Sequence, residues 1–221
     1  MRHFVFDAYG TLFDVHSAAS RYRDAIGANW DRLSQIWRAK HLEYTWIQAQ
    51  TGQHVSFWTL AQRSLDYAIA ATGGAPEGVR DKLLSAYRTL SAYPEVADVL
   101  RDLKQTGAKL AILTNGDRDM IDDAVASSGI GDVLDEIITV HEAGIYKPNP
   151  AVYRLPCDRF GVEPGAISFQ SSNRWDIAGA KAFGFHCVWI NRQGAPDEYP
   201  DMPADRIYTD LKALLPLAAQ S

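Results

Sequence analysis

Asp7 is the residue of this chain best placed for covalent chemistry. It follows Phe4–Phe6, a short apolar run typical of a buried parallel strand, and Gly10 then allows a tight turn. In open α/β sheets, ligands bind in the crevice beyond the carboxyl ends of the strands. A carboxylate at that position is poorly solvated, so we interpret Asp7 as a nucleophile and not as a surface charge.

Further polar side chains lie after this strand and after the other expected strands. They are Thr11, Thr114, Asn115, Lys147, Ser171, Asn173 and Asp176. A single hydroxyl or amide at a strand end usually reflects turn chemistry. Turn chemistry does not explain their recurrence at successive strands, whose carboxyl ends meet at one edge of a parallel sheet. The sequence therefore predicts one polar site at that edge.

The elements that must position this site are of two kinds. Residues 15–92 have a helical pattern with no strand signal, whereas strands and helices alternate from Pro94 onward, which predicts a parallel sheet with right-handed crossovers. The expected strands are 4–6, 109–114, 136–140, 166–170, 186–190 and a short edge strand at 206–208. We therefore expect an α/β fold with a Rossmann-like parallel sheet core, residues 1–14 and 93–221, and an inserted helical-bundle cap, residues 15–92.

Apolar spacing locates the helices. Within 31–50, one stripe at helical spacing contains Leu33, Ile36, Trp37, Tyr44 and Ile47. Ser56 is expected to cap the next helix, and Pro76 to lie in the first turn of a third. The helices expected in the core are 94–107, 120–127, 150–160 and 177–183.

Composition narrows the classes of partner. The chain of 221 residues is 47% hydrophobic and 22% charged, which is ordinary for a globular protein. Its net charge of −5 argues against a nucleic-acid or anionic-membrane partner, and no stretch has the length of a membrane span or the pattern of an export signal. Cys157 and Cys187 are expected to be reduced thiols, which favours a cytoplasmic location.

The polar motifs, together with the expected cap, resemble the haloacid dehalogenase superfamily, whose four motifs lie in this order at strand ends. Within it the chain resembles the L-2-haloacid dehalogenases, because residues 7–14 (DAYGTLFD), 37–46 (WRAKHLEYTW) and 171–176 (SSNRWD) are close to that family's wording. The resemblance covers nearly the whole chain and implies the superfamily's fold.

Two short motifs separate the dehalogenases from the superfamily's phosphatases. A magnesium phosphatase would carry a second Asp where Tyr9 stands, and a Gly-Asp pair near 172–173, where the chain has Ser172 and Asn173. A phenol and an amide leave too few hard oxygen ligands for Mg²⁺. We therefore expect neither metal nor cofactor.

The expected reaction has two steps. Asp7 displaces the halide from C2 of a short 2-haloacid with inversion and becomes an aspartyl ester. Water activated by Asp176 then attacks the ester carbonyl, while Lys147 keeps Asp7 ionised and offsets charge on the ester oxygen. Hydrogen bonds that orient these groups are expected from Thr11, Thr114, Ser171 and Asn173.

The residues expected to contact the substrate follow mainly from the resemblance. It assigns Arg38 of the cap and Asn115 as halide ligands. Around the substrate we further expect Tyr9, Leu42, Phe57, Thr114, Tyr153 and Trp175. Arg174 departs from the family, in which a small or uncharged residue is more usual, and we expect its side chain to point to solvent.

Two other functions stay open at this stage. One is a phosphatase of the same superfamily, and the other is a non-catalytic binder of small carboxylates. The expected partners are a small 2-haloalkanoate and a halide ion, and the resemblance suggests a homodimer. Halogen preference and chain-length range are not fixed by the sequence.

Overall fold

The computed structural model describes residues 2–219 and contains a six-stranded parallel sheet with the strand order β3-β2-β1-β4-β5-β6. The strands are β1 (His3–Phe6), β2 (Lys109–Thr114), β3 (Glu136–Thr139), β4 (Ile167–Ser171), β5 (His186–Ile190) and β6 (Arg206–Tyr208). β1 lies in the interior of the sheet, where Phe6 pairs with Ile112 on one side and Gln170 on the other. The expected parallel sheet is confirmed, and every expected strand is present within a residue or two of its predicted ends.

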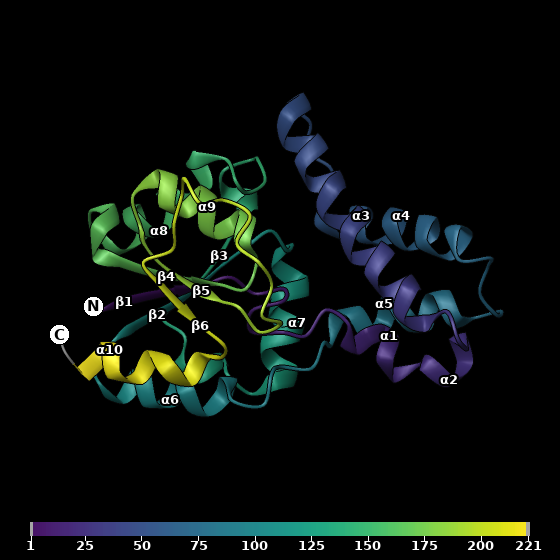
Figure 1. Ribbon diagram of the computed structural model, residues 1–221, viewed down its shortest axis with the longest axis horizontal. Coiled ribbons are helices and arrows are strands. Elements are labelled where there is room, and N and C mark those ends of the chain that lie inside the picture. The colour runs from purple at the N-terminus through teal and green to yellow at the C-terminus, as the bar shows by residue number, and fades with distance from the viewer. Residues whose placement is uncertain (1, 220–221) are drawn as a thin grey trace.

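Helices cover both faces of the sheet. The helices that follow the cap are α6 (Val96–Gln105), α7 (Arg118–Ser128), α8 (Pro150–Phe160), α9 (Arg174–Phe183) and α10 (Leu215–Ala219). Short 3₁₀ turns lie at Gly131–Val133, Val140–Glu142, Pro164–Ala166 and Leu211–Leu214. α8 and α9 lie on one face, and α6 and α10 lie on the other (Figure 1).

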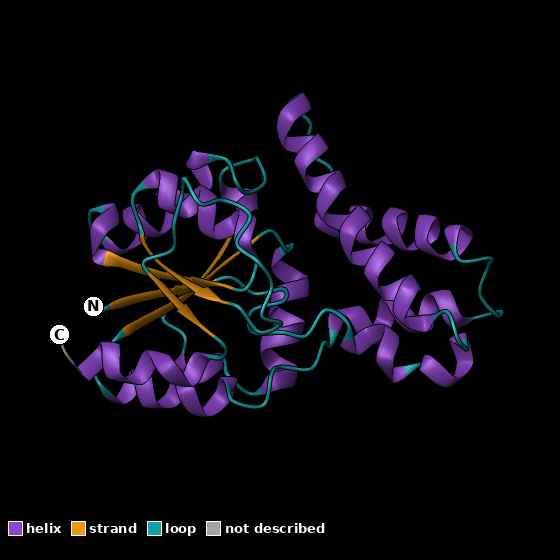
Figure 2. Ribbon diagram, viewed as in Figure 1, coloured by secondary structure: helices purple, strands orange, loops and turns teal. Residues whose placement is uncertain are grey.

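Five helices stand beside this layered unit (Figures 1 and 2). They are α1 (Ser17–Arg21), α2 (Arg23–Ile26), α3 (Trp30–Thr51), α4 (Phe57–Ala71) and α5 (Val79–Arg88). The chain enters and leaves this group through adjacent segments: the N–H of Asp14 donates to Ser91 O (2.8 Å), and that of Tyr93 to Leu12 O (3.0 Å). The expected helical region between β1 and the rest of the sheet is therefore present.

The helix boundaries differ from the expected ones in informative ways. Ser56 caps α4 as expected, accepting from the Thr59 N–H at 3.2 Å. α5 begins at Val79 and not near Pro76, and α6 begins at Val96 and not at Pro94. α9 begins at Arg174, three residues earlier than expected. Two of its first three residues, Arg174 and Asp176, are charged, so the apolar pattern did not indicate this turn.

The predicted apolar stripe of α3 is partly wrong. Ile47 is 53% exposed, whereas Ser34, His41 and Thr45 are buried with Leu33 and Trp37. The His41 ring bridges two neighbours, because Nε2 bonds Phe57 O (3.1 Å) and Nδ1 bonds the Tyr87 hydroxyl (3.3 Å). Polar groups can line this packed face since hydrogen bonds satisfy them.

None of the helices within residues 2–219 combines the length and the apolar character that crossing a membrane requires.

Candidate active site

Asp7 lies just after β1, and its two carboxylate oxygens have different surroundings. The residue is 6% exposed. Oδ2 accepts hydrogen bonds from Asn173 Nδ2 (2.7 Å), Thr11 Oγ1 (2.9 Å) and Ser171 Oγ (3.3 Å). Oδ1 accepts from Lys147 Nζ at 3.1 Å. Oδ2 is therefore held by three neutral donors, and Oδ1 faces the cation.

Lys147 connects Asp7 to a second buried carboxylate. Its side chain is completely buried, and Nζ also donates to Asp176 Oδ2 at 2.9 Å. The other oxygen of Asp176 accepts from the Tyr153 hydroxyl at 2.8 Å. The resulting chain of contacts, Asp7–Lys147–Asp176–Tyr153, joins the end of β1 to α8 and α9.

Burial and charge act against each other in this cluster. Burial raises the pKa of Asp176, the Lys147 ammonium opposes that shift, and the net result is a pKa of about 6. Burial alone would lower the pKa of Lys147, but attraction to Asp176 and Asp7 outweighs burial and raises this pKa above its ordinary value. Lys147 is therefore a cation at neutral pH, and Asp176 can change its charge near neutrality.

Helices α1–α5 contribute side chains that cover the site at Asp7. Arg38 of α3 donates through Nη2 to Tyr9 O (3.0 Å) and to Asn173 Oδ1 (3.0 Å). Asn115 is 7% exposed, and its Oδ1 accepts from the Lys147 N–H at 3.1 Å. A small pocket between the two parts is lined by Asp7, Tyr9, Arg38, Leu42, Phe57, Asn115, Asn173 and Trp175. The structure thus brings most of the predicted substrate-side residues together.

Two predicted residues, Thr114 and Tyr153, lie outside this pocket. The Thr114 hydroxyl accepts from the Gly116 N–H (3.0 Å), and within residues 2–219 it contacts neither carboxylate nor the pocket. Tyr153 lies behind Asp176, fully buried, so it reaches the site through that carboxylate. Tyr9, in contrast, lines the pocket as expected; its ring packs against Phe57 and its carbonyl accepts from Arg38.

The expectation that Arg174 points to solvent is wrong. The residue is 4% exposed, and its side chain packs against the loop that precedes β6. Nε donates to Asp197 Oδ1 (2.6 Å), while Nη2 donates to the carbonyls of Tyr199 (2.6 Å) and Met202 (2.9 Å). These partners lie more than twenty residues downstream, where no periodic pattern indicates that they return to α9.

Asp117 contributes to the site and was missed by the sequence analysis. Its carboxylate accepts from the N–H groups of Phe57 (3.1 Å) and Trp58 (2.8 Å), the first residues of α4. In the same region, the Tyr146 hydroxyl donates to Val55 O at 2.6 Å. Asp117 directly follows Thr114-Asn115-Gly116 and precedes α7, so the local sequence suggests a cap for α7. Its actual partner is sixty residues away.

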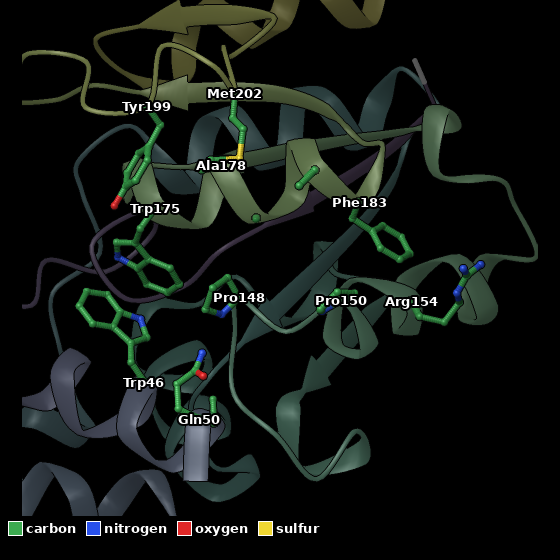
Figure 3. Close-up of a pocket in the computed structure, with 13 residues that line it drawn as sticks. Trp46, Gln50, Pro148, Pro150, Arg154, Trp175, Ala178, Phe183, Tyr199 and Met202 are labelled. Atoms are coloured by element: carbon green, nitrogen blue, oxygen red, sulfur yellow. The ribbon is translucent and has the colours of Figure 1, made fainter. Parts of the chain in front are cut away.

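A second, larger hollow adjoins the pocket (Figure 3). Its volume is about 700 Å³, and its walls come from α3, α8, α9 and the loop around Tyr199 and Met202. Trp46 and Trp175 lie together at one end of it, in an edge-to-face arrangement with their ring centroids 5.6 Å apart. Because Trp175 also lines the pocket at Asp7, this indole is a wall common to both spaces.

The donor set around Asp7 does not suit a dedicated magnesium site. The Tyr9 ring packs against Phe57, and Asn173 Oδ1 already accepts from the Arg38 guanidinium. Within residues 2–219, no group of three or more His, Cys, Asp or Glu side chains is arranged to hold a metal ion. The fold and the site together define the class: a protein with a parallel α/β sheet and an inserted helical group, in which a buried aspartate after β1 lies beside a buried lysine.

Comparison with known proteins refines this class. A family model described as haloacid dehalogenase-like hydrolase matches residues 1–184. (S)-2-haloacid dehalogenase 4A of Burkholderia cepacia is 44% identical over 222 residues, covering 100% of this chain and 96% of that protein.

Two solved structures have the same overall fold. A dehalogenase with an intermediate complex superposes with a TM-score of 0.96 at 44% identity, covering 98% of this chain and 96% of that one. The L-2-haloacid dehalogenase of Xanthobacter autotrophicus with chloropropionic acid covalently bound gives a TM-score of 0.87 at 33% identity, covering 99% and 98%. The chain belongs to the haloacid dehalogenase-like hydrolases and, within them, to the L-2-haloacid dehalogenase family.

Proposed function

We propose that this protein hydrolyses short (S)-2-haloacids to (R)-2-hydroxyacids and halide, with Asp7 as the nucleophile. The observation that carries the proposal is the arrangement of Lys147 between Asp7 and Asp176, both buried, beneath a pocket closed by Arg38. The names of the relatives agree with this substrate class.

The first step is a displacement at C2. Asp7 Oδ1 accepts one hydrogen bond and Oδ2 accepts three, so we assign Oδ1 as the attacking oxygen. Attack opposite to the carbon–halogen bond forms a C2–Oδ1 bond, releases X⁻ and inverts C2. Arg38 and Asn115 are assigned to the departing halide, since both line the pocket and offer N–H donors.

The second step hydrolyses the aspartyl ester. Asp176 takes a proton from water, whose oxygen attacks Cγ of Asp7. The carbonyl oxygen of the ester is then Oδ2, and the donors from Thr11, Ser171 and Asn173 stabilise its developing negative charge. Lys147 donates towards Oδ1, which leaves with C2 as the hydroxyl oxygen of the product.

This route predicts where the oxygen atoms go. In a single turnover in H₂¹⁸O with enzyme in excess, the label should enter the carboxylate of Asp7 and not the 2-hydroxyacid. Mass spectrometry of the peptide that contains Asp7 measures this directly. Label found in the product hydroxyl after one turnover would contradict an ester at Asp7 and favour direct attack of water on C2.

A further inference from the structure

The pocket at Asp7 is small for a substrate. Its free volume is about 10 Å³, which is the room of about one water molecule. Three large side chains, those of Leu42, Phe57 and Trp175, supply its apolar walls. A 2-haloacid carries a carboxylate, a halogen and an alkyl group on C2, so the length of alkyl group that fits depends on which wall can give way.

Phe57 is a fixed wall. It is 1% exposed, and its ring lies against three other rings at centroid separations of 4.0 to 6.5 Å, those of Tyr9, His41 and Tyr146. The backbone N–H of Phe57 also donates to Asp117 at 3.1 Å, so its main chain is held as well as its ring. The pocket therefore cannot widen on this side without disturbing the packing of α4.

Trp175 is held less firmly. Its indole Nε1 has no hydrogen-bond partner among residues 2–219, and within that range its ring makes one aromatic contact, with Trp46. Trp175 also lines the hollow of about 700 Å³, and no other described residue lines both the hollow and the pocket. The indole is thus the boundary between a very small space and a large one.

The hollow is open because α9 carries small residues on the face that borders it. Three of them follow Trp175 at spacings of three, four and seven residues, namely Ala178, Gly179 and Ala182. A Cβ at Gly179 would lie 2.7 Å from the Cβ of Pro148, so the missing side chain lets α9 approach that segment closely. The space is therefore a product of the sequence of α9 and not a gap left by one large residue.

Arg174 fixes the loop that forms another wall of the hollow. Its Nη2 donates to the carbonyls of Tyr199 (2.6 Å) and Met202 (2.9 Å), whose side chains project towards α9 in Figure 3. Apart from Gln50 and Arg154, the described side chains that line the hollow are apolar or aromatic, and none of them carries a carboxylate. The hollow therefore suits an alkyl chain.

We propose that Trp175 sets the chain length of the substrate by closing the pocket at Asp7 off from this hollow. The proposal rests on the proposed function, because it concerns the alkyl group of the same 2-haloacids. The wild-type protein acts on acids of two and three carbon atoms, and a longer alkyl group meets the indole. When the indole is removed, the carbons beyond C3 enter the hollow.

The test compares halide release from L-2-chloropropionate and L-2-chlorohexanoate, which differ by three methylene groups. We expect the wild-type protein to favour the shorter acid. Trp175→Ala should shift the ratio of the two kcat/KM values towards the longer acid by about tenfold or more, since each methylene buried in an apolar space is worth up to about fourfold. Damage to the fold would lower both values and could not produce this shift.

A second variant checks that the hollow receives the chain. Ala178→Leu in the Trp175→Ala background fills the hollow one turn from the missing indole, so the ratio should return towards the wild-type value. Turnover of L-2-chloropropionate should persist. Trp30→Ala is the matched control, because Trp30 begins α3 and lines neither space, and it should leave the ratio unchanged.

A wild-type protein that converts both acids equally well, or a ratio that Trp175→Ala leaves unchanged, would overturn the role of Trp175. Calorimetric titration with propionate and hexanoate, which carry no halogen, tests the hollow without turnover. Tighter binding of hexanoate than of propionate by Trp175→Ala but not by the wild-type protein, with no halide released from any haloacid, would preserve that role and remove the proposed function. Halide release with an unchanged ratio would do the reverse.

Discussion

Lys147 is the residue on which both the stability and the proposed chemistry of the site depend. Its ammonium group is completely buried and lies within 3.1 Å of Asp7 and 2.9 Å of Asp176. A buried cation between two carboxylates is costly to desolvate, and its removal leaves both partners unpaired. The cluster as a whole therefore adds little net stability, but the removal of Lys147 alone destabilises the fold.

Replacing Lys147 by Met should therefore destabilise the protein and abolish turnover. Leaving buried charges without their partner typically costs about 3–5 kcal/mol, which urea denaturation monitored by circular dichroism would measure. The matched control is Lys104→Met, which breaks the more exposed pair with Asp135 and should cost about 1 kcal/mol or less. Equal effects of the two substitutions would contradict a special role for Lys147.

The pKa of Asp176 leads to a pH dependence with a definite sign. Burial raises this pKa to about 6, and the proposed base must be ionised to accept a proton from water. The kcat should therefore fall as the pH falls through about 6, and Lys147, with its raised pKa, keeps its charge on the basic side. A pH–rate profile on a short 2-haloacid measures this. A kcat that stays constant down to pH 4 would exclude Asp176 as the base.

For individual residues, the sequence could predict which side chains meet at the carboxyl edge of the sheet. It could not predict contacts between residues that are far apart in the chain. Asp7, Lys147 and Asp176 were placed together because parallel strands present their carboxyl ends at one edge. Arg174 was misplaced because nothing local indicates that the loop at 197–202 folds back onto α9.

At the scale of elements, α4 is positioned by a carboxylate from outside the helical group. Asp117 accepts from two N–H groups in the first turn of α4, and that turn carries Phe57 into the pocket. Ser56 caps the same turn locally and was predicted, because an N-cap serine is recognisable from adjacent sequence. The contribution of Asp117 depends on tertiary structure and could not be recognised.

Asp117→Ala should loosen the fit of α4 against the sheet unit. We expect a loss of about 0.5–2 kcal/mol, as for other helix N-caps, together with a raised KM because Phe57 is less firmly placed. Steady-state kinetics and thermal unfolding measure the two effects. Ser56→Ala is the comparison: it removes a cap of the same helix without breaking the link to the sheet unit. A higher KM for Ser56→Ala than for Asp117→Ala would contradict this assignment.

At the scale of the whole molecule, we propose that residues 1–14 with 93–221 and residues 15–92 act as two domains with the reaction at their junction. Asp7, Lys147 and Asp176 come from the sheet unit, while Arg38, Leu42 and Phe57 come from the helices. Arg38 links the two through Tyr9 O and Asn173. A pocket built this way needs both units.

The exposed apolar residues near the C-terminal end of α3 bear on the expected homodimer. Trp46 and Ile47 are consecutive apolar residues of this helix and are 36% and 53% exposed, and burying such surface against a second chain would favour association. Together with the family resemblance, they support the expectation of a homodimer. Light scattering during size exclusion should give twice the mass of one chain, and Ile47→Lys should lower it. A monomeric wild-type protein at micromolar concentration would contradict the expectation.

We propose that Asp7 displaces the halide without the help of a metal ion. The most direct measurement is halide release from L- and D-2-chloropropionate in the presence of a chelator, with Asp7→Asn alongside. We expect the wild-type protein to convert the L-isomer alone, to yield D-lactate and to be unaffected by the chelator, whereas Asp7→Asn should release no halide. Absence of halide from both isomers, together with magnesium-dependent cleavage of a phosphate ester, would contradict a metal-free displacement by Asp7.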